Sequence, residues 1–181
     1  MKLRELVREL LIQELGDTRG AYNFRMTQDP ASSIEATSGG EVEVKYEFTT
    51  DTGTEYTVRI YNYVFADEVE DGIELVVEFW HGAGAMSLTD EGDAFRVVGT
   101  VADVVEDFVK NHKEETEAAL AKAWETDFAK ITSLVVDAIG KAGEEGKGYE
   151  DMSRTKLYRL FAMNRGFDFD FSGRYPTIEL E

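Results

Sequence analysis

The stretch that decides the fold is EVEVKYEFTTDTGTEYTVRI, residues 41–60. Apolar and polar residues alternate through Val42–Phe48 and again through Tyr56–Ile60. This period of two is typical of strands with one buried face, and Asp51-Thr52-Gly53 supplies the turn that joins them. The stretch therefore predicts an antiparallel β-hairpin.

Further elements follow the hairpin along the chain. Ile73–Trp80 predicts a third strand, and Phe95–Val98 predicts a short fourth strand. Thr100 is expected to cap a long amphipathic helix that ends near Glu125. Segment 128–139 fits either a helix or a buried strand, and its cluster of β-branched residues favours the strand.

The two flanks of the chain add helices and a second hairpin. Residues 1–16 predict an N-terminal helix, and residues 17–40 a partly mobile connection with a short strand at Tyr22–Met26. Ser153–Asn164 predicts a basic helix, and Phe167–Leu180 predicts a closing hairpin. The order indicates one domain.

This domain is expected to be α+β and to cover residues 1–181, with a twisted mixed sheet and antiparallel N-terminal hairpins. A hydrophobic share of 43% is ample for a core, which excludes wholesale disorder. The chain has no cysteine, so disulfides, thiolate nucleophiles and cysteine-based zinc sites are excluded. Charged residues interrupt the apolar pattern at the start, and no apolar run approaches the ~20 residues of a membrane span. We therefore expect a cytoplasmic protein.

The charge is concentrated in the middle of the chain. The formal net charge is −18, and residues 41–151 contain 27 acidic and 9 basic residues, which accounts for all of it. Such a surface repels phosphates, so we expect no binding of duplex nucleic acid through the acidic face. The charge instead predicts a basic protein surface as partner.

No metal site is predicted. The only histidines, His81 and His112, are expected on different elements, a strand end and a helix face. Asp90-Glu91-Gly92-Asp93 lacks the ligand ladder of an EF-hand. The glycine-rich stretch at 80–85 has Ser87 where a dinucleotide fingerprint needs glycine, so it predicts a turn.

Two sequence blocks resemble a group of uncharacterised tailed-bacteriophage proteins. They are Gly92-Asp93-Ala94-Phe95-Arg96-Val97-Val98-Gly99-Thr100-Val101 and Ser153-Arg154-Thr155-Lys156-Leu157-Tyr158. The resemblance covers roughly Gly92 to the C-terminus. It implies a phage origin and, with it, a host-cell location, but it implies no activity.

The order of elements also resembles the fold of GCN5-related N-acetyltransferases, in which a loop Q/R-x-x-G-x-G/A binds the pyrophosphate of acetyl-CoA. Segment 96–101 stands in that place, so the resemblance implies cofactor contacts from Arg96, Gly99 and Thr100. Val101 replaces the final small residue, where its branched side chain would crowd the phosphate.

The same resemblance implies one catalytic residue. Leu157-Tyr158 and Gly166-Phe167 match a Leu-Tyr pair on the later helix and the Gly-Phe that opens a later strand of these enzymes. Tyr158 would then protonate the departing thiolate. The alternative is that both residues of the pair pack the helix on the sheet.

A basic cluster accompanies that helix. Arg154, Lys156, Arg159 and Arg165 are candidates for contact with an anion or a partner. Since the rest of the chain repels polyanions, internal docking against the acidic middle is the favoured alternative.

The sequence predicts a non-enzymatic phage accessory protein that needs no cofactor and acts through protein–protein contacts with a basic or host protein. One alternative is an enzyme that uses acetyl-CoA to acetylate a cationic amine. The other is an acidic nucleic-acid mimic that inhibits a host DNA-binding protein. Homo-oligomerisation and association with the virion stay open.

Overall fold

The computed structural model describes residues 20–36, 41–62, 72–82, 94–127, 129–136, 159, 163–170 and 177–180. The strands are β1 (Phe24–Gln28), β2 (Glu43–Thr49), β3 (Glu55–Asn62), β4 (Ile73–His81), β5 (Ile131–Val136), β6 (Asp168–Asp170) and β7 (Thr177–Glu179). The helices are α2 (Pro30–Ala36), α3 (Ala94–Asp107), the π-helical segment η3 (Phe108–His112) and α4 (Lys113–Ala123).

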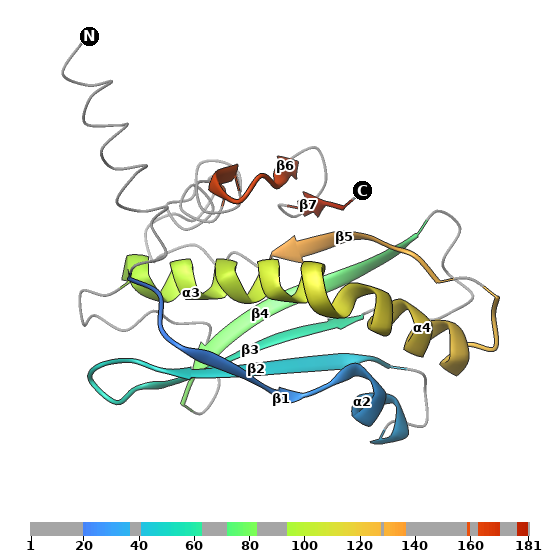
Figure 1. Ribbon diagram of the computed structural model, residues 1–181, viewed down its shortest axis with the longest axis horizontal. Helices are drawn as coiled ribbons and strands as arrows, with labels where there is room; N and C mark the ends of the chain where they lie inside the picture. Colours follow the sequence, from blue (N-terminus) through green and yellow to red (C-terminus); the bar gives the residue numbers. More distant parts are fainter. Residues whose placement is uncertain are drawn as a thin grey trace, which may run out of the picture.

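The strands form one seven-stranded mixed sheet in the order β1-β2-β3-β4-β5-β7-β6 (Figure 1). Neighbouring strands are antiparallel except β4 and β5, which are parallel. A parallel pair needs a long crossover, and the continuous α3-η3-α4 helix lies between them in sequence. The predicted α+β domain with a mixed sheet is therefore confirmed.

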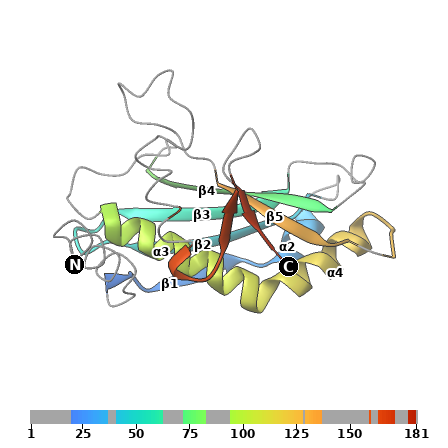
Figure 2. The same cartoon turned by 90° about the horizontal axis from the view of Figure 1, so that it is seen from above.

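The predicted hairpin is β2 and β3. Their register pairs Val44 with Ile60 and Phe48 with Tyr56, and these four side chains are buried. Figures 1 and 2 show α3 and α4 along one face of the sheet. The buried residues of β2, β3 and β4 form one core with the apolar side of α3. Alternation in the strands thus directs one face to the helix.

The long helix begins earlier than predicted. The expected strand Phe95–Val98 is wrong, because α3 extends from Ala94 to Asp107. Thr100 is likewise inside the helix and does not cap it. The valines of α3 recur at helical spacing and are buried against the sheet: Val97, Val98, Val101, Val104 and Val105. Burial of that stripe outweighs the β-propensity of valine.

Segment 128–139 contains β5, so the strand prediction is confirmed over Ile131–Val136. Gly72 allows the close approach of β4 to β5. Its φ is +135°, and a Cβ at this position would lie 2.3 Å from Thr132. Only glycine fits there without displacing the neighbouring strand.

The segment before β2 is more regular than predicted. The expected strand at Tyr22–Met26 is present as β1, shifted to Phe24–Gln28, and helix α2 follows it. Asp29 precedes α2, and its carboxylate accepts hydrogen bonds from the Ser32 backbone N–H at 2.9 Å and the Ser32 hydroxyl at 2.7 Å. These bonds lower the pKa of Asp29. Asp followed by Pro is an N-terminal helix signal that the sequence prediction missed.

The closing hairpin is confirmed as β6 and β7, which are antiparallel. The predicted N-terminal helix at 1–16 lies outside the described residues, as does most of the predicted basic helix. Of that helix, Arg159, Met163 and Asn164 are described and are helical. Among the helices that the structure describes, none combines the length and the apolar character needed to span a bilayer.

Candidate functional site

A groove of about 480 Å³ lies at the end of the sheet where β1 begins. β1 pairs with β2 from Phe24 onward, opposite Phe48, and the preceding residues do not join the ladder. The groove is lined by that preceding segment, by the turn end of β2 and β3, and by α3: Ala21, Tyr22, Asn23, Phe24, Arg25, Glu47, Phe48, Thr49, Asp51, Glu55, Tyr56, Thr57 and Arg96.

Thr100 fixes the segment before β1 to α3. The Tyr22 backbone N–H donates to Thr100 Oγ1 at 2.9 Å, in a buried position. The same hydroxyl donates to the Arg96 carbonyl at 2.8 Å. Thr100 is fully buried, so its hydroxyl satisfies polar groups that water does not reach. This contact separates the segment from β2 and forms one wall of the groove.

Arg96 closes the groove on the helix side. Its Nε–H donates to the Gly20 carbonyl, and its terminal nitrogen forms an ion pair with Asp51 in the β2–β3 turn. Its guanidinium lies 3.8 Å from the centre of the Tyr22 ring. A planar guanidinium can make all three contacts at once, which a lysine cannot. Arg96 therefore joins three separate parts of the chain.

A row of rings forms the inner side of the groove and continues across the sheet. Tyr22 stacks on Phe48 with 5.8 Å between ring centres, and Phe48 stacks on Tyr56 at 5.1 Å. His81, at the end of β4, lies 5.3 Å from the Tyr56 ring at a tilt of 57°. Offset stacking of this kind adds to the free energy gained by burial. Tyr22, Phe48 and Tyr56 are buried in the core, so this row supports the groove from beneath and offers little surface to a ligand.

Three carboxylates and two guanidinium groups contribute charge to the groove. Glu47 pairs with Arg25 at 3.2 Å across β1 and β2; the Arg25 side chain is largely exposed and that of Glu47 is partly exposed. Asp51 pairs with Arg96. Glu55 is exposed and forms no ion pair in the part of the chain that the structure describes. The groove therefore has an unbalanced negative charge.

The structure brings Arg96, Gly99 and Thr100 together, but as consecutive turns of α3. The prediction that a strand ends, a loop follows and a helix begins within this segment is wrong, because the whole segment is helical. Gly99 and Thr100 lie beyond the first four residues of α3, where backbone N–H groups bond to carbonyls within the helix. Their N–H groups are thus not arranged as a phosphate-binding loop. Tyr158 lies outside the described residues.

Arg165 contacts acidic residues of its own chain, which is the alternative that we predicted for the basic cluster. Its side chain is only 5% exposed, and its Nε donates to Asp103 at 2.9 Å. It also donates to the Gly99 carbonyl at 3.2 Å. Burial raises the pKa of Asp103, and Arg165 opposes that shift. Arg159 is exposed, while Arg154 and Lys156 lie outside the described residues.

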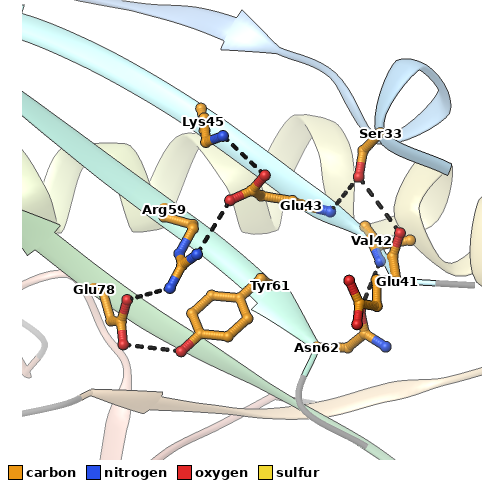
Figure 3. A network of polar contacts seen from close by, with 9 residues as sticks. All are labelled: Ser33, Glu41, Val42, Glu43, Lys45, Arg59, Tyr61, Asn62 and Glu78. Carbon is orange, nitrogen blue, oxygen red and sulfur yellow. Dashed lines mark hydrogen bonds and ion pairs between the residues drawn. The ribbon is translucent and has the colours of Figure 1, made fainter. Parts of the chain in front are cut away.

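The sheet face opposite α3 has its own charged network (Figure 3). Arg59 lies between Glu78, at 2.6 Å, and Glu43, at 3.4 Å. Lys45 also pairs with Glu43, at 2.8 Å, and the Tyr61 hydroxyl donates to Glu78 at 2.8 Å. Each cation is thus neutralised by a carboxylate of its own or an adjacent strand.

A polar cluster joins β2 to the π-helical segment. The Tyr46 hydroxyl donates to Asp107 at 3.1 Å, and Asp107 lies 3.6 Å from His112 Nε2. Burial, and then the charge of Asp107, raises the pKa of Tyr46 well above its usual range. Tyr46 therefore stays protonated and holds η3 on the sheet. Sequence patterns give no signal for this cluster, since it depends on the π-helical register.

The described residues contain no group of three or more histidines and carboxylates arranged to hold a metal ion. No protein-family model, curated protein or solved structure matches the chain.

Proposed function

We propose that this protein is not an enzyme and acts through protein–protein contacts with a basic partner. The observation that carries the proposal is the pairing of its bases. Of the ten Lys and Arg side chains described, seven form ion pairs with carboxylates of the same chain: Arg25, Lys45, Arg59, Arg96, Lys110, Lys113 and Arg165. The cations of this part of the chain are thus largely neutralised internally.

The acids remain in excess. Seven exposed carboxylates form no ion pair within the described part of the chain: Glu55, Glu74, Glu114, Glu125, Asp127, Asp168 and Glu179. Charge of one sign on a surface steers and selects partners of the opposite sign. This supports a partner with a basic surface and opposes a polyanion.

The residues expected to bind the cofactor make contacts within the chain, and this supports the non-enzymatic proposal. Arg96 and Thr100 hold the segment before β1, and the Gly99 carbonyl accepts a bond from Arg165. Isothermal titration with acetyl-CoA and an acyl-transfer assay on cationic amines test it. We expect neither binding at micromolar concentrations nor transfer. Binding accompanied by transfer to any amine would overturn the proposal.

An acetyltransferase-like enzyme is the second candidate, and the order of elements favours it. Antiparallel strands, a long helix, a parallel strand and a closing hairpin follow one another in the order on which the resemblance rests. If acyl transfer is detected, this candidate expects Tyr158→Phe and Gly99→Val to reduce it. Transfer unchanged in both variants would contradict the mechanism. The phage origin is proposed from the two sequence blocks alone.

A further inference from the structure

We infer that His112 is a pH-sensitive switch: its protonated ring binds both Asp107 and Glu115 and stabilises the π-helical segment between them. The inference goes beyond the proposed function, because it concerns the response of the fold to pH and needs no partner. It rests on the position of the ring between two carboxylates, on a buried ring nitrogen and on the irregular backbone at this point.

Each ring nitrogen of His112 lies near a carboxylate from a different helix. Nε2 is 3.6 Å from Oδ2 of Asp107, and Nδ1 is 3.7 Å from Oε2 of Glu115. A neutral imidazole has one N–H, so it directs a lone pair toward one of these two oxygens. The imidazolium has an N–H for each of them. The arrangement is therefore complementary to the protonated ring.

The Nδ1 atom of His112 needs a partner. It is buried and forms no hydrogen bond within the described part of the chain. Buried polar atoms without a partner are rare, and 3.7 Å to Glu115 is too long for a hydrogen bond. The Glu115 side chain is 53% exposed, so it has room to approach. A positive charge on the ring would attract this carboxylate and satisfy Nδ1.

The backbone at His112 is the junction between two kinds of helix. His112 ends η3 and precedes α4, and its φ of −129° and ψ of −9° depart from helical values. π-Helical turns are rare and frequently occur at functional sites. Asp107 lies just before η3 and Glu115 lies in the first turn of α4. A ring bound to both carboxylates would therefore connect the two ends of the π-helical segment.

The neighbouring charges leave His112 as the group that responds to pH. Tyr46 of β2 donates to Asp107 and stays protonated, because burial raises its pKa. Lys110 and Lys113 each form an ion pair with a glutamate four residues away. Helix α2 packs against α4, and its described side chains at 30–33 carry no charge. Histidine is the side chain that ordinarily changes its charge between pH 5 and 8.

The test is amide hydrogen exchange of the full chain at pH 5.5 and 7.5. Each rate is divided by that of the unfolded chain at the same pH, which removes the chemical effect of pH on exchange. We expect the amides of residues 108–116 to be about three- to tenfold more protected at pH 5.5, as two partly exposed ion pairs would give. His112→Gln, which stays polar but uncharged, should abolish this difference. Glu115→Gln should remove about half of it on a logarithmic scale.

The matched control is His81→Gln, because His81 is the only other histidine of the chain and lies at the end of β4. This variant should keep the wild-type response. Equal protection of the wild type at both pH values would overturn the inference, as would a response that survives in His112→Gln or disappears equally in His81→Gln. If His112→Gln fails to fold, the exposed Glu115→Gln decides, and an unchanged response in that variant would contradict the switch.

Discussion

Arg165 and Thr100 each tie a peripheral segment to α3 through a polar contact that is at least partly buried. Arg165 joins the residues before β6 to Asp103, and Thr100 joins the residues before β1 to the middle of the helix. In both cases a buried polar group depends on a single side chain. A buried group that loses its partner costs more free energy than the bond itself contributes.

Arg165→Ala is expected to reduce the free energy of unfolding by about 2–4 kcal/mol, because it leaves the Asp103 carboxylate half-buried without its cation. Urea denaturation measures the change. The control is Lys122→Ala, an exposed base without an ion pair in the described chain, which should change stability by less than about 0.5 kcal/mol. Adding Asp103→Ala should recover part of the loss. Equal losses of unfolding free energy in Arg165→Ala and Lys122→Ala would contradict a stabilising contact between Arg165 and Asp103.

Glu74→Gln is expected to stabilise the protein at neutral pH. Partial burial and then the charge of Glu179 raise the pKa of Glu74 above its unfolded value. The folded state therefore binds the proton more tightly, so this carboxylate costs stability at high pH and the cost disappears as pH falls through the raised pKa. Thermal unfolding should show a gain of about 1–2 °C at pH 7.5.

That gain should vanish below the ordinary glutamate pKa of about 4.3, where the Glu74 side chain is neutral in both the folded and the unfolded protein. Glu179→Gln should give a smaller gain, because it relieves the repulsion but not the burial of Glu74, and the double variant should gain less than the sum of the two. A gain that persists unchanged at pH 4 would mean that packing, and not charge, is responsible.

At the scale of elements, alternation in β2 and β3 predicted the hairpin, and β-branched residues predicted β5. Residues 95–98 are also predicted from their local pattern to form a strand, yet they belong to α3. Tertiary packing explains why this segment is helical. The valines of α3 form one stripe that is buried on the sheet, and the local propensity of a residue does not depend on which element packs against it.

The groove could not be predicted from sequence. Tyr22, Glu55 and Arg96 lie far apart in the chain, and they meet because the residues before β1 leave β2 and cross to α3. Arg96 and Thr100 were singled out for another reason, their likeness to a phosphate-binding loop. No local pattern marks a groove that depends on where one strand ends relative to its neighbour.

Thr100→Val tests this crossing. Valine keeps the shape of threonine but removes the acceptor for the Tyr22 N–H, so the free energy of unfolding should fall by about 1–3 kcal/mol. Hydrogen exchange should show faster exchange of the Tyr22 amide. Thr100→Ser keeps the hydroxyl and should protect that amide as the wild type does. Equal exchange in the two variants would show that the contact does not hold the segment.

At the scale of the whole molecule, a net charge of −18 opposes folding through self-repulsion and favours basic partners. The described bases reduce this repulsion locally by pairing, as Arg59 does between Glu43 and Glu78 (Figure 3). Within the described part of the chain, seven exposed carboxylates such as Glu55 and Glu114 form no ion pair and are accessible to a partner. The same negative charge therefore lowers the stability of the protein and favours the basic partner that we propose.

Raising the NaCl concentration from 20 to 300 mM should increase the melting temperature by several degrees, because salt screens repulsion between carboxylates. Differential scanning fluorimetry measures it, and KCl serves as the control for specific sodium binding. A melting temperature that falls with both salts would mean that the internal ion pairs outweigh the repulsion.

The most direct test of the central claim is capture of partners from a bacterial lysate on the immobilised protein, followed by mass spectrometry at 50 and 500 mM NaCl. We predict that basic proteins are enriched and that high salt releases them, since contacts between opposite charges weaken with ionic strength. Enrichment of DNA-binding proteins in particular would favour the nucleic-acid mimic. Capture that is insensitive to salt, or that selects acidic proteins, would contradict the claim.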